Sequence, residues 1–238
     1  MTTRKYEQRL RAESAEETRR RILDAVCRRL RSAPAEPVSI DEIARMARVS
    51  RSTVYLVFGS RAGLFCALGA DLLERGGFVS MLAAASHPDA REALRGGIRG
   101  VAGMYAAHRD VLRALNSMAQ LDADAVGGAV QKMDEGRAGG MAAQAQRLAE
   151  QGILRADVTV DAATDLLCLL TSFDSFDLLH TGRGLPAAAA AELLITAAER
   201  SLCQPFRAPA DESADSQDIS GDTGDPSWTA AASRSCGL

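Results

Sequence analysis

One stretch of 23 residues constrains this chain more than any other: SIDEIARMARVSRSTVYLVFGSR, at positions 39–61. It contains two amphipathic helical patterns, and each is too short to be stable in water by itself. Three serines of the type that begins helices, Ser39, Ser50 and Ser60, divide the stretch. Such dense local specification indicates that the two helices must be held at one fixed angle, each burying its apolar side against a neighbour.

The first pattern predicts a helix of about two turns from Ile40 to Ala47. Ser39 and Glu42 have the S-x-x-E spacing of a capping box, in which the serine hydroxyl accepts from one free backbone N–H and the glutamate reaches back to another. Val38 and Ile43 stand where a hydrophobic staple packs. The apolar residues fall at i, i+3, i+4 and i+7 and form one buried face: Ile40, Ile43, Ala44 and Ala47.

The second pattern predicts another short helix after an interruption at Arg48-Val49-Ser50. Ser50 is its expected N-cap, and its buried stripe is Val54, Val57 and Phe58. The helix opens with Arg51, and its other face carries Ser52, Thr53, Tyr55 and Leu56. Two short helices joined by a tight turn, with an outward face able to reach base edges and phosphates, match the helix-turn-helix arrangement for binding DNA.

Charge also points to an anionic partner at this end of the chain. Residues 1–61 contain fourteen Arg or Lys and eight Asp or Glu, a net charge of +6, whereas the whole chain has −3. Arg51 and Arg61 stand at the first positions of their predicted helices, where the helix dipole disfavours a cation by ~0.3–1 kcal/mol. A nearby phosphate would reverse that sign. The alternative is a solvated charged face on which water and salt screen the cost.

Composition favours an all-α fold, because Ala, Leu and Arg are frequent, aromatic residues make up only 4% and β-branched runs are scarce. A first helix is predicted over 18–31, with Ile22, Val26 and Leu30 on one stripe. Longer helices are expected at 61–75, 89–107, 109–120, 123–151, 159–181 and 186–203. After Gln204 the chain is rich in Pro, Ser, Asp and Gly, which predicts a disordered acidic tail.

The sequence indicates no cofactor, no metal site and no enzyme. The five cysteines are scattered and never approach a CxxC spacing: Cys27, Cys66, Cys168, Cys203 and Cys236. The E-x-x-H pairs of a di-iron bundle are absent, as are G-x-S-x-G, Walker A and G-x-G-x-x-G motifs. No apolar run reaches the ~18 residues of a membrane span, and the charged N-terminus lacks an apolar signal region, so we expect a cytoplasmic protein without a membrane partner.

Two motifs together resemble a known family. T-x-x-x-I-L-x-A at Thr18–Ala25 and I-x-x-I-A-x-x-A-x-V-S-x-x-T-x-Y-x-x-F-x-S-[KR]-x-x-L at Ile40–Leu64 are similar to the DNA-binding domain of TetR-family transcriptional regulators. The resemblance implies a three-helix head, a larger helical domain that binds a small effector, and a homodimer formed mainly by the last two helices. It also places Thr53, Tyr55 and Arg61 at DNA-contacting positions, with Tyr55 and Arg61 on phosphates and the 51–56 surface on bases.

The stretch departs from the family pattern at three positions. Arg48 stands where the turn usually has Gly, which costs about 1 kcal/mol or more if the backbone is left-handed there, although its side chain could reach a phosphate. Val57 replaces the usual residue with a polar tip, so that phosphate contact is lost. Leu56 could rest on a thymine methyl in the groove or pack on the head. The operator sequence therefore does not follow from the resemblance.

We expect four segments: a flexible charged arm (1–17), the DNA-binding head (18–62), a helical ligand-binding and dimerisation domain (63–203) and the tail (204–238). The third segment is rich in glycine over 89–151, and its soft apolar side chains could line a pocket for an apolar or amphipathic effector, although such residues at helical spacing are more often plain core. The candidate effector-binding residues are Ile98, Val101, Met104, Tyr105, His108, Met118, Met133, Met141, Phe173 and His180.

Residues 159–203 are rich in Leu and Ala and suit a self-complementary four-helix dimer interface. A dimer would place two recognition helices roughly 34 Å apart on near-palindromic double-stranded operator DNA. The expected function is a ligand-responsive repressor released from its operator by a small molecule. The alternatives are a transcriptional activator and a helical protein-interaction module without DNA binding.

Overall fold

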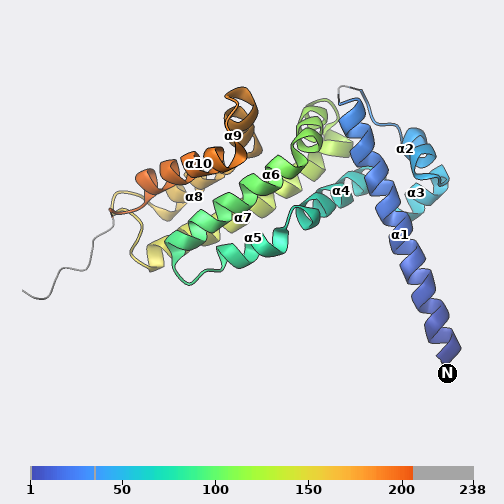
Figure 1. The fold of residues 1–238 in the computed structure, drawn as a ribbon, viewed down its shortest axis with the longest axis horizontal. Helices are drawn as coiled ribbons and strands as arrows, with labels where there is room; N and C mark the ends of the chain where they lie inside the picture. The colour runs from blue at the N-terminus through green and yellow to red at the C-terminus, as the bar shows by residue number, and fades with distance from the viewer. Residues whose placement is uncertain (1, 35, 206–238) are drawn as a thin grey trace, which may run out of the picture. The chain divides into compact units, whose positions relative to one another are not determined.

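The computed structural model describes residues 2–34 and 36–205, and helices make up most of them (Figure 1). No strand occurs in these residues, whose β pairing is one isolated bridge between Leu154 and Cys203. The all-α expectation is confirmed. In chain order the elements are α1 (Thr2–Ser32), α2 (Ile40–Ala47), α3 (Arg51–Phe58), α4 (Arg61–Arg75), α5 (Phe78–Ala85), α6 (Ala90–Leu121), η1 (Ala123–Gly127), α7 (Gly128–Glu150), α8 (Val160–Leu170), α9 (Phe173–Asp177), η2 (Leu178–Gly182) and α10 (Ala187–Leu202).

Residues 2–17, expected as a flexible arm, are helical and continue directly into the first predicted helix as α1. The physical reason lies in the sequence, because no Gly or Pro interrupts this segment and an i,i+4 ion pair between Arg9 and Glu13 (2.8 Å) supports it. Tyr6 is 63% exposed, and the N-terminal part of α1 that carries it projects away from the other helices (Figure 1). The tail was expected from residue 204, but Gln204 is still held by the body, because its N–H donates to the Ile153 carbonyl (2.8 Å). The rest of the expected tail, beyond Pro205, lies outside the described residues.

The later helices differ from their predicted spans in three places. The helices expected at 89–107 and 109–120 are one helix, α6, with a kink at His108 (φ −122°, ψ 16°). The helix expected at 159–181 breaks at Thr171, where Ser172 caps α9 and one π turn, η2, follows. The unpredicted α5, FVSMLAAA, is apolar on nearly every side, so its sequence carries no amphipathic stripe that would have revealed it.

Two apolar cores organise the fold. The first joins the head to the body: Ile22 of α1, Ile43 of α2, Val54 of α3 and Leu64 of α4 belong to the same cluster as Leu115 of α6. The second core lies among α6, α7, α8 and α10, and includes Leu94, Leu148, Leu167 and Ile195. Because the first core is continuous across α4, a displacement of this helix must affect the head and the body together. Here the head means residues 18–62 and the body residues 63–203.

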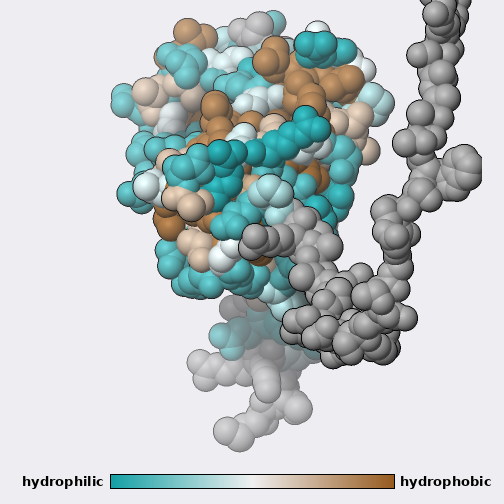
Figure 2. Space-filling model, turned by 90° about the vertical axis from the view of Figure 1, so that its left-hand side faces the viewer, coloured by the Kyte–Doolittle hydropathy of each residue, from teal (hydrophilic) through white to brown (hydrophobic). Residues whose placement is uncertain are grey.

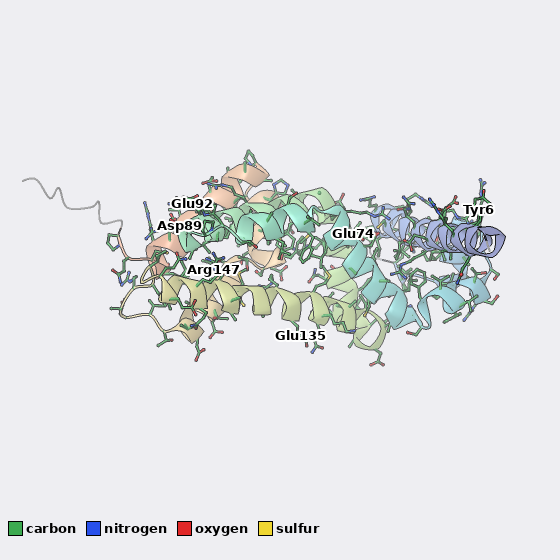
Figure 3. All side chains as sticks on the ribbon, turned by 90° about the horizontal axis from the view of Figure 1, so that it is seen from below. Tyr6, Glu74, Asp89, Glu92, Glu135 and Arg147 are labelled. Atoms are coloured by element: carbon green, nitrogen blue, oxygen red, sulfur yellow. The ribbon has the colours of Figure 1, made fainter. Side chains whose placement is uncertain are left out.

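The connection between α5 and α6 is fixed to α7 by hydrogen bonds. The Arg147 guanidinium donates to the backbone oxygens of Ala85 (2.6 Å) and His87. The Asp89 carboxylate caps α6 by accepting from the N–H groups of Arg91 (2.7 Å) and Glu92 (3.1 Å). Figure 3 shows Arg147, Asp89 and Glu92 at the same end of the α6–α7 pair. These caps lower the pKa of Asp89, because two backbone N–H groups stabilise its charged form.

In the part of the chain that the structure describes, no single helix has the length and apolarity to cross a membrane; α3 and α4 meet that test only as a pair bent by 66°.

Candidate nucleic-acid interface

The turn between α2 and α3 is a Schellman motif. Arg48 adopts the left-handed conformation (φ 56°, ψ 46°), and it is the one non-glycine residue with positive φ among those described. The Val49 N–H donates to the Ala44 carbonyl (2.9 Å) and the Arg48 N–H to the Arg45 carbonyl (3.2 Å), which satisfies the free carbonyls at the end of α2. The left-handed backbone, which the sequence left as a condition at Arg48, is therefore present and ends α2 sharply.

The serine caps behave differently at the three helix starts. Ser50 Oγ accepts from the Thr53 N–H (3.0 Å) and Ser60 Oγ from the Gly63 N–H (2.9 Å), as expected. Ser39 makes no side-chain capping bond, so the predicted capping box with Glu42 is wrong. The reason is a competing partner, since the Glu42 carboxylate accepts from Arg29 Nε (2.7 Å).

Arg29 organises the connection between α1 and α2, and we did not identify it from the sequence. It is only 4% exposed, and its guanidinium also donates to Glu36 (3.0 Å) and to the backbone oxygens of Ala33 (2.8 Å) and Pro37 (3.3 Å). A buried guanidinium requires such saturation of its donors. The available signal was its position, because Arg29 lies three residues after Val26 and interrupts the apolar stripe of α1.

The outward face of α3 is presented to solvent. Val54 is buried at 2% exposure and anchors the helix, whereas Arg51, Ser52, Tyr55 and Leu56 are exposed and Thr53 is half-buried. Leu56 reaches 86% exposure, so its side chain does not pack on the head. Together with the exposed Arg48, these residues form one surface, which we call the recognition face: Arg48, Arg51, Ser52, Thr53, Tyr55 and Leu56.

A cation and a phenol pair on the recognition face. The Arg51 guanidinium lies 5.7 Å from the centre of the Tyr55 ring and 2.9 Å from an Asp41 oxygen. The Tyr55 hydroxyl and the Asp41 carboxylate raise the pKa of Arg51 above its ordinary value. Both members of the Arg51–Asp41 pair are more than half exposed, and such surface pairs contribute little to stability. A phosphate can therefore replace Asp41 as the partner of Arg51 at small cost.

Arg61 lies apart from the recognition face and bridges the head and the body. Its guanidinium pairs with Asp122, the residue that caps η1, and donates to the Val38 carbonyl (3.3 Å). It also lies 5.5 Å from the centre of the Phe65 ring. Of the seven residues expected at the DNA interface, the structure thus brings six together and engages Arg61 in a contact between α4 and η1.

The candidate effector-binding residues separate into groups. Tyr105 and Phe173 pack edge to face (5.4 Å), and the Tyr105 hydroxyl donates to the Thr171 carbonyl (3.0 Å). Burial raises the pKa of Tyr105 to about 12. His180 stacks on Phe176 (5.2 Å), with its Nδ1 2.7 Å from the Leu185 carbonyl oxygen. The first core holds Val101, Met104, Met118 and Met133 with this aromatic group, and the second core holds Ile98 and Met141.

His108 is the exception, because it lines a cavity of about 210 Å³ between α1, α4 and α6. The structure therefore does not gather the ten candidates around one space. Instead, Met133 packs against Gly69 of α4, and Met104 packs against Gly76 at the end of that helix. Within the glycine-rich stretch 89–151, Gly96 and Gly100 likewise allow close packing, against Ala84 and Met81 of α5.

Comparison with known proteins identifies the region that contains the recognition face. Residues 22–68 match the family model described as bacterial regulatory proteins, tetR family. None of the curated proteins matches the chain significantly by sequence.

Solved structures with the same fold cover most of the chain. One is a TetR-like transcriptional regulator from Rhodococcus sp. RHA1, with 26% identity, a TM-score of 0.57 and coverage of 77% of this chain and 94% of that one. Another is NalD of Pseudomonas aeruginosa, the secondary repressor of a multidrug efflux pump (21% identity, TM-score 0.60, coverage 81% and 100%). A third is the fatty acid degradation regulator FadR of Bacillus halodurans (14%, 0.59, coverage 76% and 93%).

Proposed function

Because the chain belongs to the TetR family of bacterial regulatory proteins, we propose that it is a ligand-responsive transcriptional repressor that binds operator DNA as a homodimer. Regulators of this family are non-enzymatic transcription factors, so the expectation that the chain is not an enzyme holds through its family. DNA binding follows from the family as well. Repression, the response to a small molecule and the individual contact residues are our proposals, and so is action in the cytoplasm, where operator DNA is reached.

The main support for the proposal is that the recognition face lies on α3, a helix held in place by capping interactions. α3 is only eight residues long, so its orientation depends on the Schellman turn before it and on the burial of Val54. A helix held in this way can enter the major groove as a rigid unit. The polar side chains of α3 point outward. Leu56 would be buried if this face packed against the rest of the protein, yet it is almost fully exposed.

We assign the contacts by chemistry. Arg48, Arg51 and Tyr55 bind backbone phosphates, because guanidinium and phenol groups donate to phosphate oxygens. Ser52 and Thr53 hydrogen-bond to base edges, and Leu56 contacts a thymine methyl. Arg61 reaches a phosphate only when it leaves Asp122, so operator binding and the contact between α4 and η1 compete for the same guanidinium.

A dimer through residues 159–203 is supported by exposed apolar side chains there. Leu169 of α8, Leu178 of η2 and Leu193 of α10 are 62%, 65% and 48% exposed. Figure 2 shows that apolar patches interrupt the hydrophilic surface at the end of the body that faces the viewer. Covering such leucines with a second copy removes apolar area from water. A two-fold dimer would require a near-palindromic operator.

Release by an apolar or amphipathic small molecule is supported by the soft packing between α4 and the rest of the body. The methionines that fill the glycine positions of α4 can change rotamer at low cost, and a ligand that displaces them would shift α4. Since α4 belongs to the core shared with the head, its shift changes the spacing of the two recognition helices. NalD is a repressor, and the likeness of this chain to NalD supports repression over the alternative, activation.

The test is a footprint of the purified protein on DNA flanking its own gene, at fixed salt. We expect protection of a two-fold symmetric site by the wild type and weakened protection by Tyr55→Ala. Lys132→Ala, which removes an exposed charge on α7 of the body, serves as the control and should protect the site like the wild type. No protection of the DNA by any of the three proteins would instead favour the protein-interaction module.

A further inference from the structure

The junction of the head and the body contains a half-open cavity of about 210 Å³, which we call the junction crevice. Its walls come from α1, α4 and α6, which contact one another in the fold (Figure 1). The residues that line it are Asp24, Cys27, Arg28, Arg31, Leu72, Arg75 and His108. Of the ten effector-binding candidates, His108 alone lines it, so the crevice is separate from the apolar packing of the other nine.

The charge of the junction crevice is predominantly positive. Three arginines line it against a single carboxylate, Asp24. Arg75 is held by Asp24 (2.5 Å) and by Asp71 (2.9 Å), which fixes its position on the wall. Arg28 and Arg31 are exposed and form no ion pair with any described residue. Two guanidinium groups are therefore free to bind a ligand from one side of the crevice.

His108 of α6 also lines the crevice and has unsatisfied ring nitrogens. It lies at the kink of α6, and both of its ring nitrogens are buried without a hydrogen-bond partner among the described residues. Burial lowers the pKa of His108, and the nearby charges of Arg31 and Arg75 lower it further. A buried polar group without a partner is costly, so a ligand that accepts a hydrogen bond from this ring gains binding energy that water outside the crevice cannot supply.

From this juxtaposition we propose that the junction crevice binds a small anion bearing a carboxylate or phosphate group, held by Arg28, Arg31 and His108. Guanidinium groups match the oxygens of both anions. The volume is below the ~300–1,000 Å³ of pockets for drug-sized ligands, so the occupant is a small acid and not a bulky amphipathic molecule. Binding of the anion raises the pKa of His108 and allows the ring to donate a charge-assisted hydrogen bond.

The anion would regulate DNA binding, and this part rests on the proposed function. Arg28 and Arg31 lie at the end of the head helix α1, while His108 lies in the body on α6. A ligand that bridges them favours one orientation of the head over another, and its effect on operator affinity equals its preference between the two. The kink at His108 places the contact where the backbone of α6 is already non-helical.

Imidazole NMR tests the binding without DNA. The chain contains three histidines, and His108→Gln assigns the signals of His108. Sodium phosphate and sodium succinate are titrated into the full-length protein against sodium chloride at equal ionic strength. We expect saturable shifts of the His108 signals with at least one of the two anions, and none beyond the chloride response at His87 and His180. Which anion acts distinguishes phosphate from carboxylate recognition.

Charge variants provide the matched comparison. Arg28→Ala/Arg31→Ala should weaken binding of the anion by at least tenfold. Arg20→Ala/Arg21→Ala removes the same charge from positions of α1 outside the crevice, and it should leave the affinity for the anion within twofold of wild type. Equal affinities in the two double variants, or no saturable shift with either anion, would overturn the proposal. If the anion binds but does not change operator affinity, the regulatory part is wrong. A failure of operator binding by itself would refute only the proposed function, because the titration contains no DNA.

Discussion

The left-handed backbone at Arg48 offers a test that separates strain from charge. An L-residue in this conformation costs about 1–2 kcal/mol, and glycine avoids that cost but loses about 0.5–1 kcal/mol more backbone entropy on folding. The Arg48 side chain is exposed and makes no hydrogen bond with a described residue, so its removal should not change stability otherwise. We therefore expect Arg48→Gly to raise the free energy of unfolding by about 0.5–1 kcal/mol.

Arg48→Ala is the control, because alanine lacks the guanidinium but keeps the strain. Urea unfolding should give Arg48→Ala the stability of the wild type, with Arg48→Gly above both. Both variants should lose the same operator affinity, and the slope of log K against log salt should decrease by ~0.9 in each if Arg48 binds one phosphate. Equal stability of the Gly and Ala variants would refute the strain argument, and an unchanged salt slope would refute the phosphate contact.

Two further predictions concern the head and the body. Ser50→Ala should cost about 1 kcal/mol of stability because it removes the cap of α3, whereas Ser39→Ala, which removes no cap, should stay within about 0.5 kcal/mol; equal losses in urea unfolding would contradict the caps. Asp177 is buried, which would raise its pKa, but hydrogen bonds from Arg109, Thr181 and Arg113 outweigh this and hold the pKa far below its usual value. Asp177→Asn should therefore lower the free energy of unfolding by about 1–3 kcal/mol at pH 7. The loss is smaller than for a fully buried ion pair, because both arginines are partly exposed. Because the pKa of Asp177 is lower in the folded than in the unfolded protein, the charged carboxylate stabilises the fold fully above the unfolded pKa of about 3.9 and less as the pH falls below it. The difference in free energy of unfolding between wild type and Asp177→Asn should therefore narrow by pH 3. A difference that widens would contradict the stabilising role of the charged Asp177.

The recognition face could be predicted because its signals are local. Ser50, Val54 and the outward residues of α3 follow from helix periodicity and capping preferences within one turn of the chain. The resemblance pointed to position 48 as the turn that usually holds Gly, and the backbone of Arg48 is left-handed there. Helix existence was also predictable in most of the body, since the apolar stripes of α4 and α10 extend over several turns.

What the sequence did not reveal depends on partners far along the chain. Glu42 has the spacing of a capping box, yet Arg29, thirteen residues earlier, takes its carboxylate. Arg61 fits a phosphate contact by position, yet Asp122 lies beside it in the fold. The short helix α5 is apolar on nearly every side, so it has no polar–apolar period that would have predicted it. The junction crevice requires three helices to meet, which no local pattern encodes.

We infer that a dimer of this chain reads DNA through two copies of α3. Selection of bound duplexes from a random library tests this inference without knowledge of the operator. We expect enrichment of one two-fold symmetric sequence with half-sites about one helical turn apart, and loss of that enrichment in a Ser52→Ala/Tyr55→Ala variant. Enrichment of no sequence, or of the same sequence by the variant and the wild type, would contradict it.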